Sequence, residues 1–228
     1  LIRQHIWYCE GEPYFKEKFH KITGIELSNY YRMASYFVIM ASINERTDSE
    51  VFPYKLFILH WAPLIGIEQV KKFLDLISLK VDNIREFIGE HKYHQSLIIE
   101  YYEDTPMLRK PAILAKEGLV VLSKKILKAG LVNLVPEILK LNLKEEYKVA
   151  FGKTLEHYAA NVFSYYGYNF TNERGIKELY KKYDLKGKSV DFLICESDGY
   201  TLIDCKAIEP APYIKTTSDP ERLRQRLK

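Results

Sequence analysis

Residues 188–207, KSVDFLICESDGYTLIDCKA, contain two apolar runs on either side of a turn sequence. Asp191 lies in the first run, and Asp204 and Lys206 lie in the second. Side chains alternate between the two faces of a strand, so an even-length turn puts these three charges on one face. A turn centred on Asp198-Gly199 pairs Asp191 with Lys206, whereas a centre at Ser197-Asp198 pairs Asp191 with Asp204. Both registers predict a hairpin with two carboxylates and one ammonium together.

This charged face has two interpretations. An exposed edge hairpin could carry an ordinary aspartate–lysine ion pair. Alternatively, two carboxylates that repel each other across adjacent strands could hold a divalent cation, since hard cations prefer carboxylate oxygens. In that case, replacing either aspartate by asparagine should raise stability in metal-free buffer. The flanking residues are apolar on both faces and favour a central strand pair; they are Phe192, Leu193, Ile194, Leu202 and Ile203.

The rest of the composition is that of an ordinary soluble globular protein. The 228 residues are 47% hydrophobic and 28% charged, with a net charge of +4 that permits a nucleic-acid partner without requiring one. The three cysteines include no CxxC pair, which favours a reducing compartment, and we expect a cytoplasmic protein. The N-terminus lacks the apolar segment of a signal peptide. The apolar stretches 30–44 and 51–67 are too short or too interrupted to span a bilayer, so we expect no membrane contact.

The chain divides into a helical part and an α/β part. Helices are expected over 26–44 and 67–89, and a hairpin over 111–123. A further helix begins at Lys124 and is expected to be interrupted by Pro136. Asn142 resembles an N-cap, with Glu145 three residues later, for a helix that ends at Gly167. We therefore expect a mostly helical domain over 1–141 and a second domain over 142–228, packed together.

The helix expected before Gly167 supplies another carboxylate. Its apolar stripe is Leu155, Ala159, Val162, Phe163 and Tyr166. At about 100° per residue, Glu156 lies roughly 60° from the stripe centre at Ala159, at the margin of the buried face. His157 and Asn161 fall on the far side. Glu156 could also be an ordinary solvent-exposed glutamate.

Together these pieces resemble the PD-(D/E)xK nuclease superfamily, which has the restriction-endonuclease-like fold. The resemblance rests on FGKTLEHYAANVFSYYGY (151–168), VDFLI (190–194) and LIDCKA (202–207). Val190 stands in place of the family's proline, and Asp204 in place of the more frequent glutamate, both of which are known variants. The fold class that we expect is α+β or α/β: a mostly helical N-terminal part, then a restriction-endonuclease-like αβββ core that is incomplete at its C-terminus.

The resemblance implies a Mg²⁺-dependent endonuclease, with Mn²⁺ as a substitute ion. Asp191 and Asp204 would bind the ion, with Glu156 and the Cys205 carbonyl completing its shell. Lys206 would orient and help deprotonate the attacking water and steady charge on the phosphate. The expected substrate is DNA, in phage defence or restriction, and the N-terminal domain could bind a second copy or a partner protein. The alternatives are an inactive nuclease-fold module that binds nucleic acid or assembles with a partner, and an RNA-cleaving toxin.

The C-terminal stretch SDPERLRQRLK predicts the start of a helix, with Asp219 as N-cap and Pro220 at the first position. The resemblance implies that this helix continues, so we expect the sequence to be truncated. Its arginines could contact a nucleic-acid backbone or form a solvated face, and its glutamine could lie near the metal; the residues concerned are Arg222, Arg224, Arg226 and Gln225.

Overall fold

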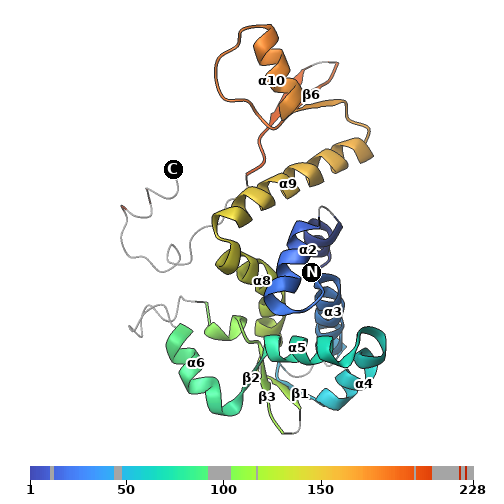
Figure 1. Ribbon diagram of the computed structural model, residues 1–228, viewed down its shortest axis with the longest axis vertical. Helices are drawn as coiled ribbons and strands as arrows, with labels where there is room; N and C mark the ends of the chain where they lie inside the picture. The colour runs from blue at the N-terminus through green and yellow to red at the C-terminus, as the bar shows by residue number, and fades with distance from the viewer. Residues whose placement is uncertain are drawn as a thin grey trace.

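The computed structural model describes residues 1–10, 13–43, 48–91, 104–116, 118–197, 199–206, 221 and 224. Within these residues the fold is α+β, as expected: helices predominate, beside a mixed four-stranded sheet and an antiparallel three-stranded sheet (Figure 1). In this part of the chain, no helix has both the length and the apolar character needed to cross a bilayer.

The elements follow one another in a simple order. The first half contains α1 (Ile2–His5), a π-helical turn (Ile6–Glu10), α2 (Tyr14–Thr23), α3 (Leu27–Ile43), β1 (Glu50–Phe52), α4 (Tyr54–Ile65), α5 (Ile67–Ile77), β2 (Ser78–Lys80), a 3-10 turn (Val81–Asn83) and α6 (Ile84–His91). The second half contains a 3-10 turn (Pro106–Leu108), β3 (Ala112–Leu114), β4 (Leu119–Val121), α8 (Lys124–Leu143), α9 (Glu145–Tyr165), β5 (Phe170–Asn172), α10 (Glu173–Lys182), β6 (Phe192–Cys195) and β7 (Tyr200–Ile203).

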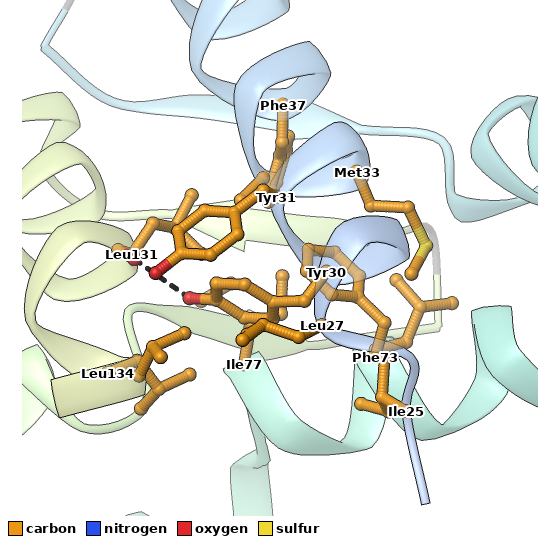
Figure 2. Close-up of a cluster of buried hydrophobic side chains, with 14 of the residues drawn as sticks. Ile25, Leu27, Tyr30, Tyr31, Met33, Phe37, Phe73, Ile77, Leu131 and Leu134 are labelled. Carbon is orange, nitrogen blue, oxygen red and sulfur yellow. Dashed lines mark hydrogen bonds between the residues drawn. The ribbon is translucent and has the colours of Figure 1, made fainter. Parts of the chain in front are cut away.

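Helix α3 forms the centre of the larger core. Its residues Leu27, Tyr30 and Met33 are fully buried, and Figure 2 shows the side chains of Tyr30 and Tyr31 reaching toward Leu131 and Leu134 of α8. The Tyr30 hydroxyl donates a 2.8 Å hydrogen bond to the Leu131 carbonyl, which supplies the partner that a buried hydroxyl requires. The predicted buried helix over 26–44 is confirmed.

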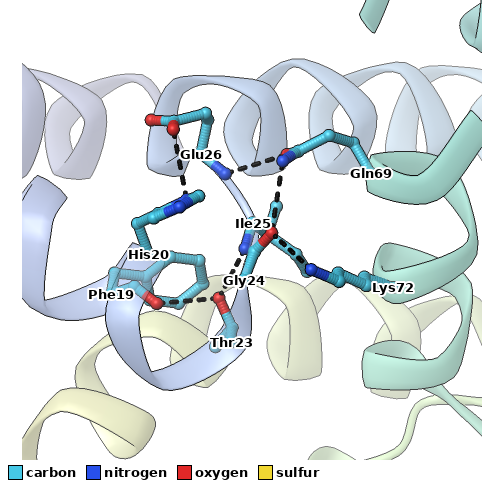
Figure 3. Close-up of polar contacts among 8 residues, drawn as sticks. All are labelled: Phe19, His20, Thr23, Gly24, Ile25, Glu26, Gln69 and Lys72. Carbon is cyan, nitrogen blue, oxygen red and sulfur yellow. Dashed lines mark hydrogen bonds and ion pairs between the residues drawn. The ribbon is translucent and has the colours of Figure 1, made fainter. Parts of the chain in front are cut away.

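A tight turn joins α2 to α3 and is held by α5 (Figure 3). Gly24 ends α2 in the left-handed conformation, at φ 68°, where glycine has no steric cost. The Gln69 side chain donates to the Gly24 carbonyl at 3.2 Å and accepts from the Glu26 backbone N–H at 2.9 Å. Lys72 also donates to the Gly24 carbonyl. Three helices are thereby fixed at one corner.

The four-stranded sheet has the order β1-β4-β3-β2. Strands β3 and β4 form the predicted hairpin over 111–123, closed by a 2.9 Å bond from the Ala115 N–H to the Gly118 carbonyl. Strand β1 pairs antiparallel with β4, and β2 pairs parallel with β3. Strands β1 and β2 are not predicted from the sequence, because each has three residues and no alternating pattern of its own.

The single helix predicted over 67–89 is wrong. Helix α5 ends at Ile77, β2 follows, and α6 begins only at Ile84. Ser78 adopts an extended conformation and its hydroxyl donates to the Leu74 carbonyl at 2.6 Å. Pairing of β2 with β3 replaces the helical hydrogen bonds of this segment, so tertiary contacts override its helical periodicity.

Two further boundary predictions are wrong. Pro136 does not interrupt the helix: α8 continues through it to Leu143, held by buried side chains before and after the proline, Leu134 and Leu139. Asn142 is not an N-cap, because it lies in the last turn of α8 and donates to the Ile138 carbonyl at 2.8 Å. The chain turns instead at Lys144, with φ 50°.

Helix α9 contacts both parts of the molecule (Figure 1). Near its start, Tyr147 shares a 2.6 Å hydrogen bond with Tyr8. Near its end, the Phe163 ring lies edge-to-face with Phe192 at 5.3 Å and with Phe170 at 5.7 Å. The helix ends before Gly167, at φ 75°, which confirms the predicted stop. The three-stranded sheet is thus carried on the C-terminal half of α9.

Candidate functional site

The β6–β7 hairpin adopts the second of the two registers considered. Cys195 pairs with Tyr200 and Phe192 with Ile203, and the Asp191 N–H donates to the Ile203 carbonyl at 3.1 Å. The register that pairs Asp191 with Lys206 is therefore wrong, and Asp191 lies opposite Ile203 with its side chain next to that of Asp204. Both registers give the same face pattern, so only the turn distinguishes them. Residue 198 lies outside the described residues.

Asp191, Asp204 and Lys206 are brought together by this register. The Asp191 Oδ2 atom accepts a 2.6 Å hydrogen bond from the backbone N–H of Cys205. The Lys206 ammonium lies 2.8 Å from Asp204 Oδ1. The hydrogen bond from Lys206 to Asp204 is the main cause that lowers the pKa of Asp204, and contact with the Asp191 side chain lowers this pKa further. The same bond to Asp204 raises the pKa of Lys206. Both charged forms are therefore favoured.

The hairpin is not buried on both faces. Strand β6 is the middle strand of the order β5-β6-β7, and its residues Phe192 and Ile194 are buried. The other face is exposed: Tyr200 is 79% and Leu202 66% accessible. The expectation of a central strand pair is wrong for β7, which is an edge strand among the described residues. The charges are tolerated because Asp204 is exposed, whereas the half-buried Asp191 carboxylate accepts a hydrogen bond from the Cys205 N–H.

Glu156 reaches the same region from α9. It is half-buried and lines a cavity of about 430 Å³ together with Asp191 and Phe192. Burial is the main cause that raises the Glu156 pKa, and the negative charge of Asp191 adds to it. The predicted position of Glu156 at the margin of the buried face of α9 is confirmed. Its carboxylate lines the same cavity as that of Asp191.

The cavity is also lined by residues that were not predicted from the sequence. Helix α9 contributes Lys153 and His157, and the start of α10 contributes Glu173 and Arg174. His157 was expected on the far side of α9, but it lines the cavity beside the first turn of α10 and stays exposed. Lys153 precedes Glu156 by one helical turn, so the i, i+3 spacing was a signal available in the sequence.

The cysteines are free thiols, as expected for a protein without disulfides. Burial raises the pKa of the Cys205 thiol, and the charges of Asp191 and Glu156 raise it further. The Cys205 backbone N–H donates a hydrogen bond to Asp191. A metal-binding role for the Cys205 carbonyl stays a prediction.

The carboxylates fit a divalent cation in chemistry, though they do not form a closed ligand set. Asp191 and Asp204 offer hard oxygen donors at one end of the β6–β7 hairpin, and Glu156 lines the same cavity as Asp191. Among the described residues, no three His, Cys, Asp or Glu side chains are grouped closely enough to enclose a metal ion. An ion would have to draw Glu156 toward the aspartate pair.

The C-terminal candidates are largely outside the described residues. Arg222, Gln225 and Arg226 belong to that part of the chain. Arg224 is described and exposed, and its guanidinium lies 3.4 Å from Glu221 Oε1. Its predicted role in binding nucleic acid stays a prediction.

Comparison of the chain with protein-family models, with curated proteins and with solved structures found no significant match.

Proposed function

We propose that this protein is a metal-dependent nuclease that cleaves DNA, built on a restriction-endonuclease-like core of α9, β5, β6 and β7. The observation that carries the proposal is the contact between Asp191 and Asp204 at one end of the β6–β7 hairpin, with Lys206 bound to Asp204 at 2.8 Å. Helix α10 lies between β5 and β6 and is an addition to the expected αβββ order. Phage defence or restriction is the biological setting that this resemblance suggests.

The carboxylates would hold the metal. Asp191 and Asp204 would be the first ligands, Glu156 would join from α9, and the Cys205 carbonyl would complete the shell. Bound Mg²⁺, or Mn²⁺ in its place, supplies an activated water and compensates negative charge on the phosphate. The hydrogen bond from the Cys205 N–H holds Asp191 in one orientation, which reduces the reorganisation needed when the ion binds.

Lys206 acts on the phosphate. Its pKa is raised, so its ammonium form persists and suits charge stabilisation rather than removal of a proton from water. A lysine ammonium is a compact charge that matches a single phosphate oxygen. Asp204 holds this ammonium beside the proposed metal position. Of the roles expected for Lys206 from the sequence, we keep the orientation of water and the stabilisation of charge on the phosphate, and drop the removal of a proton from water.

The test is plasmid nicking in Mg²⁺, in Mn²⁺ and in EDTA. Asp191→Asn, Asp204→Asn and Lys206→Ala should each lower the cleavage rate by at least about 100-fold, and Glu156→Gln should lower it less. Asp82→Asn is the matched control, since Asp82 is exposed and lies in the N-terminal part. Full activity of Asp204→Asn would end the assignment.

The same assay separates the alternatives. Cleavage of RNA but not DNA would favour the RNA-cleaving toxin. Binding of nucleic acid without cleavage in any metal would favour the inactive module that binds nucleic acid or assembles with a partner.

A further inference from the structure

Helix α4 is apolar on both of its faces. One face packs into the larger core through Phe57 and Trp61, which are buried. The other face carries three leucines that are 64%, 71% and 67% exposed, Leu56, Leu59 and Leu64. A helix at the surface of a protein normally turns a polar face to water, whereas a helix that is apolar all round is normally buried. The exposed face of α4 therefore lacks the cover that its composition calls for.

The exposed residues of α4 form one stripe. At about 100° per residue, they fall on an arc of about 140°; they are Leu56, Leu59, His60, Pro63 and Leu64. Lys55, the only formally charged residue of this helix, lies outside the arc. The stripe is thus apolar along the length of α4, except for one imidazole.

Helix α3 widens this apolar surface. The Tyr36 ring stacks on the His60 ring, with centroids 4.6 Å apart and an angle of 11° between the planes, so this face of α3 lies beside the stripe of α4. Ile39 and Ile43 follow Tyr36 by three and seven residues and share its face of the helix. They are 61% and 70% exposed. We call these side chains together the α3–α4 patch: Ile39, Ile43, Leu56, Leu59 and Leu64.

The size of the α3–α4 patch suits one side of a protein interface. Burying a leucine or an isoleucine removes roughly 100 Å² of apolar surface from water. The five side chains are each at least 61% exposed, so together they offer roughly 300 Å². A standard interface buries about 800 Å² per partner, of which about 450 Å² is apolar. The patch alone supplies most of that apolar area.

The chemistry of the patch favours a second copy of this chain as the partner. Two copies related by a two-fold axis present the same surface to each other. The patch contains no carboxylate, ammonium or guanidinium group, so such pairing leaves no charge buried without a partner. Helices that lie on a lipid surface have a polar face rich in lysine and arginine. The opposite face of α4 is instead buried in the core, which argues against a membrane as the partner.

We propose that the α3–α4 patch is a dimer interface, through which two copies of the chain pack α4 against α4 around a two-fold axis. Figure 1 shows α4 and β6 at opposite ends of the molecule, so a dimer of this kind leaves the candidate site on β6, β7 and α9 open in each copy. The inference does not depend on the proposed nuclease activity.

The experiment measures sedimentation velocity of the whole chain at about 1 to 100 µM, without metal or nucleic acid. Wild type should form a dimer whose fraction rises with concentration. Leu59→Glu places a carboxylate in the apolar interface and should weaken association by about 30-fold or more. Leu59→Ala keeps the helix and removes apolar area, so it should weaken association less. About 1 M NaCl should leave the wild-type dimer intact, since salt screens charges and not apolar contacts.

Leu141→Glu is the matched control. Leu141 is 60% exposed, like Leu59, but lies on α8 outside the patch, so this variant should dimerise as wild type does. Circular dichroism reports whether each variant folds. Because Leu59 is exposed in the single chain, Leu59→Glu should keep its helical signal; if it does not, Leu59→Ala decides.

Four results would overturn the proposal. These are wild type that stays monomeric at every concentration, a dimer that dissociates in salt, a dimer that Leu59→Glu leaves unchanged, and equal weakening by Leu141→Glu. Monomeric wild type that sediments with phosphatidylcholine vesicles would identify a lipid surface as the partner instead. Plasmid nicking is a separate assay, so a failed nuclease leaves the dimer standing, and a failed dimer leaves the nuclease standing.

Discussion

The Asp191 carboxylate is tied to the backbone of the residue between Asp204 and Lys206, through the 2.6 Å hydrogen bond from the Cys205 N–H to Asp191 Oδ2. This bond continues the contact of β6 with β7 beyond the last backbone pair, Phe192 with Ile203. The Asp191 backbone N–H also donates to the Ile203 carbonyl, so both the main chain and the side chain of Asp191 bind this end of β7. The geometry of the candidate site and the end of the hairpin are therefore set by the same interaction.

This relationship separates the effects of two substitutions at Asp191. Asp191→Asn keeps an oxygen that can accept from the Cys205 N–H, so it should melt close to wild type in EDTA. Asp191→Ala leaves that part-buried N–H without its partner and should lower stability by about 1–2 kcal/mol. Thermal melts of both variants check this. Equal melting of the two would show that the hydrogen bond contributes no stability.

Asp204 is expected to behave differently from the prediction made on repulsion alone. Its pKa is lowered by the hydrogen bond to Lys206, so its charge favours the fold, and Asp204→Asn should not raise stability in metal-free buffer. A lowered pKa gives stability that is present above the ordinary value of 3.8 and lost as the pH falls through the folded pKa. The difference between wild type and Asp204→Asn should therefore disappear in acid.

Melts from pH 7 to pH 3 test this expectation, with Lys206→Ala as the companion variant. Lys206→Ala should remove most of the effect of a further Asp204→Asn change, since the two residues act as a pair. A higher melting temperature of Asp204→Asn at pH 7 would mean that repulsion between the aspartates outweighs the ion pair.

The charge of Glu156 should have the opposite effect on stability from the charge of Asp204. The pKa of Glu156 is raised, first by burial and then by the charge of Asp191. A raised carboxyl pKa costs no stability below the ordinary value of 4.5, and the cost develops as the pH rises through the folded pKa. Glu156→Gln should therefore be more stable than wild type at pH 7 and equal to it below pH 4.5. Solvent screening keeps the gain small, about 0.5 kcal/mol.

Added Mg²⁺ should make wild type more stable than Glu156→Gln. A ligand that binds only the folded state stabilises it, and wild type retains all three carboxylates. Melts at pH 7 should then show a larger Mg²⁺-induced shift for wild type than for Glu156→Gln. Equal shifts would exclude Glu156 from the metal shell.

The sequence predicted those features that depend on local pattern. The parity of Asp191, Asp204 and Lys206, the margin position of Glu156 and the stop at Gly167 follow from strand alternation, helical periodicity and glycine chemistry. The failures depend on tertiary contacts. Strand β2 forms because β3 lies beside it, and Pro136 stays helical because buried neighbours hold it. The place of His157 in the cavity depends on α10, which no pattern before Gly167 reveals.

Phe163 provides the last prediction. Its ring joins α9 to the three-stranded sheet through Phe170 and Phe192. The buried tyrosines of α3, Tyr30 and Tyr31, belong to the larger core instead. Since the ring is half-buried, Phe163→Ala should cost about 2 kcal/mol and act mainly on the sheet that carries Asp191 and Asp204. Hydrogen exchange should then accelerate at Phe192 and Ile194 and stay unchanged at Tyr30. Tyr165→Ala, two residues later and exposed, should alter neither. Equal acceleration at Ile194 and Tyr30 would mean that the chain unfolds as one unit, which would refute the expected division into two domains near residue 142.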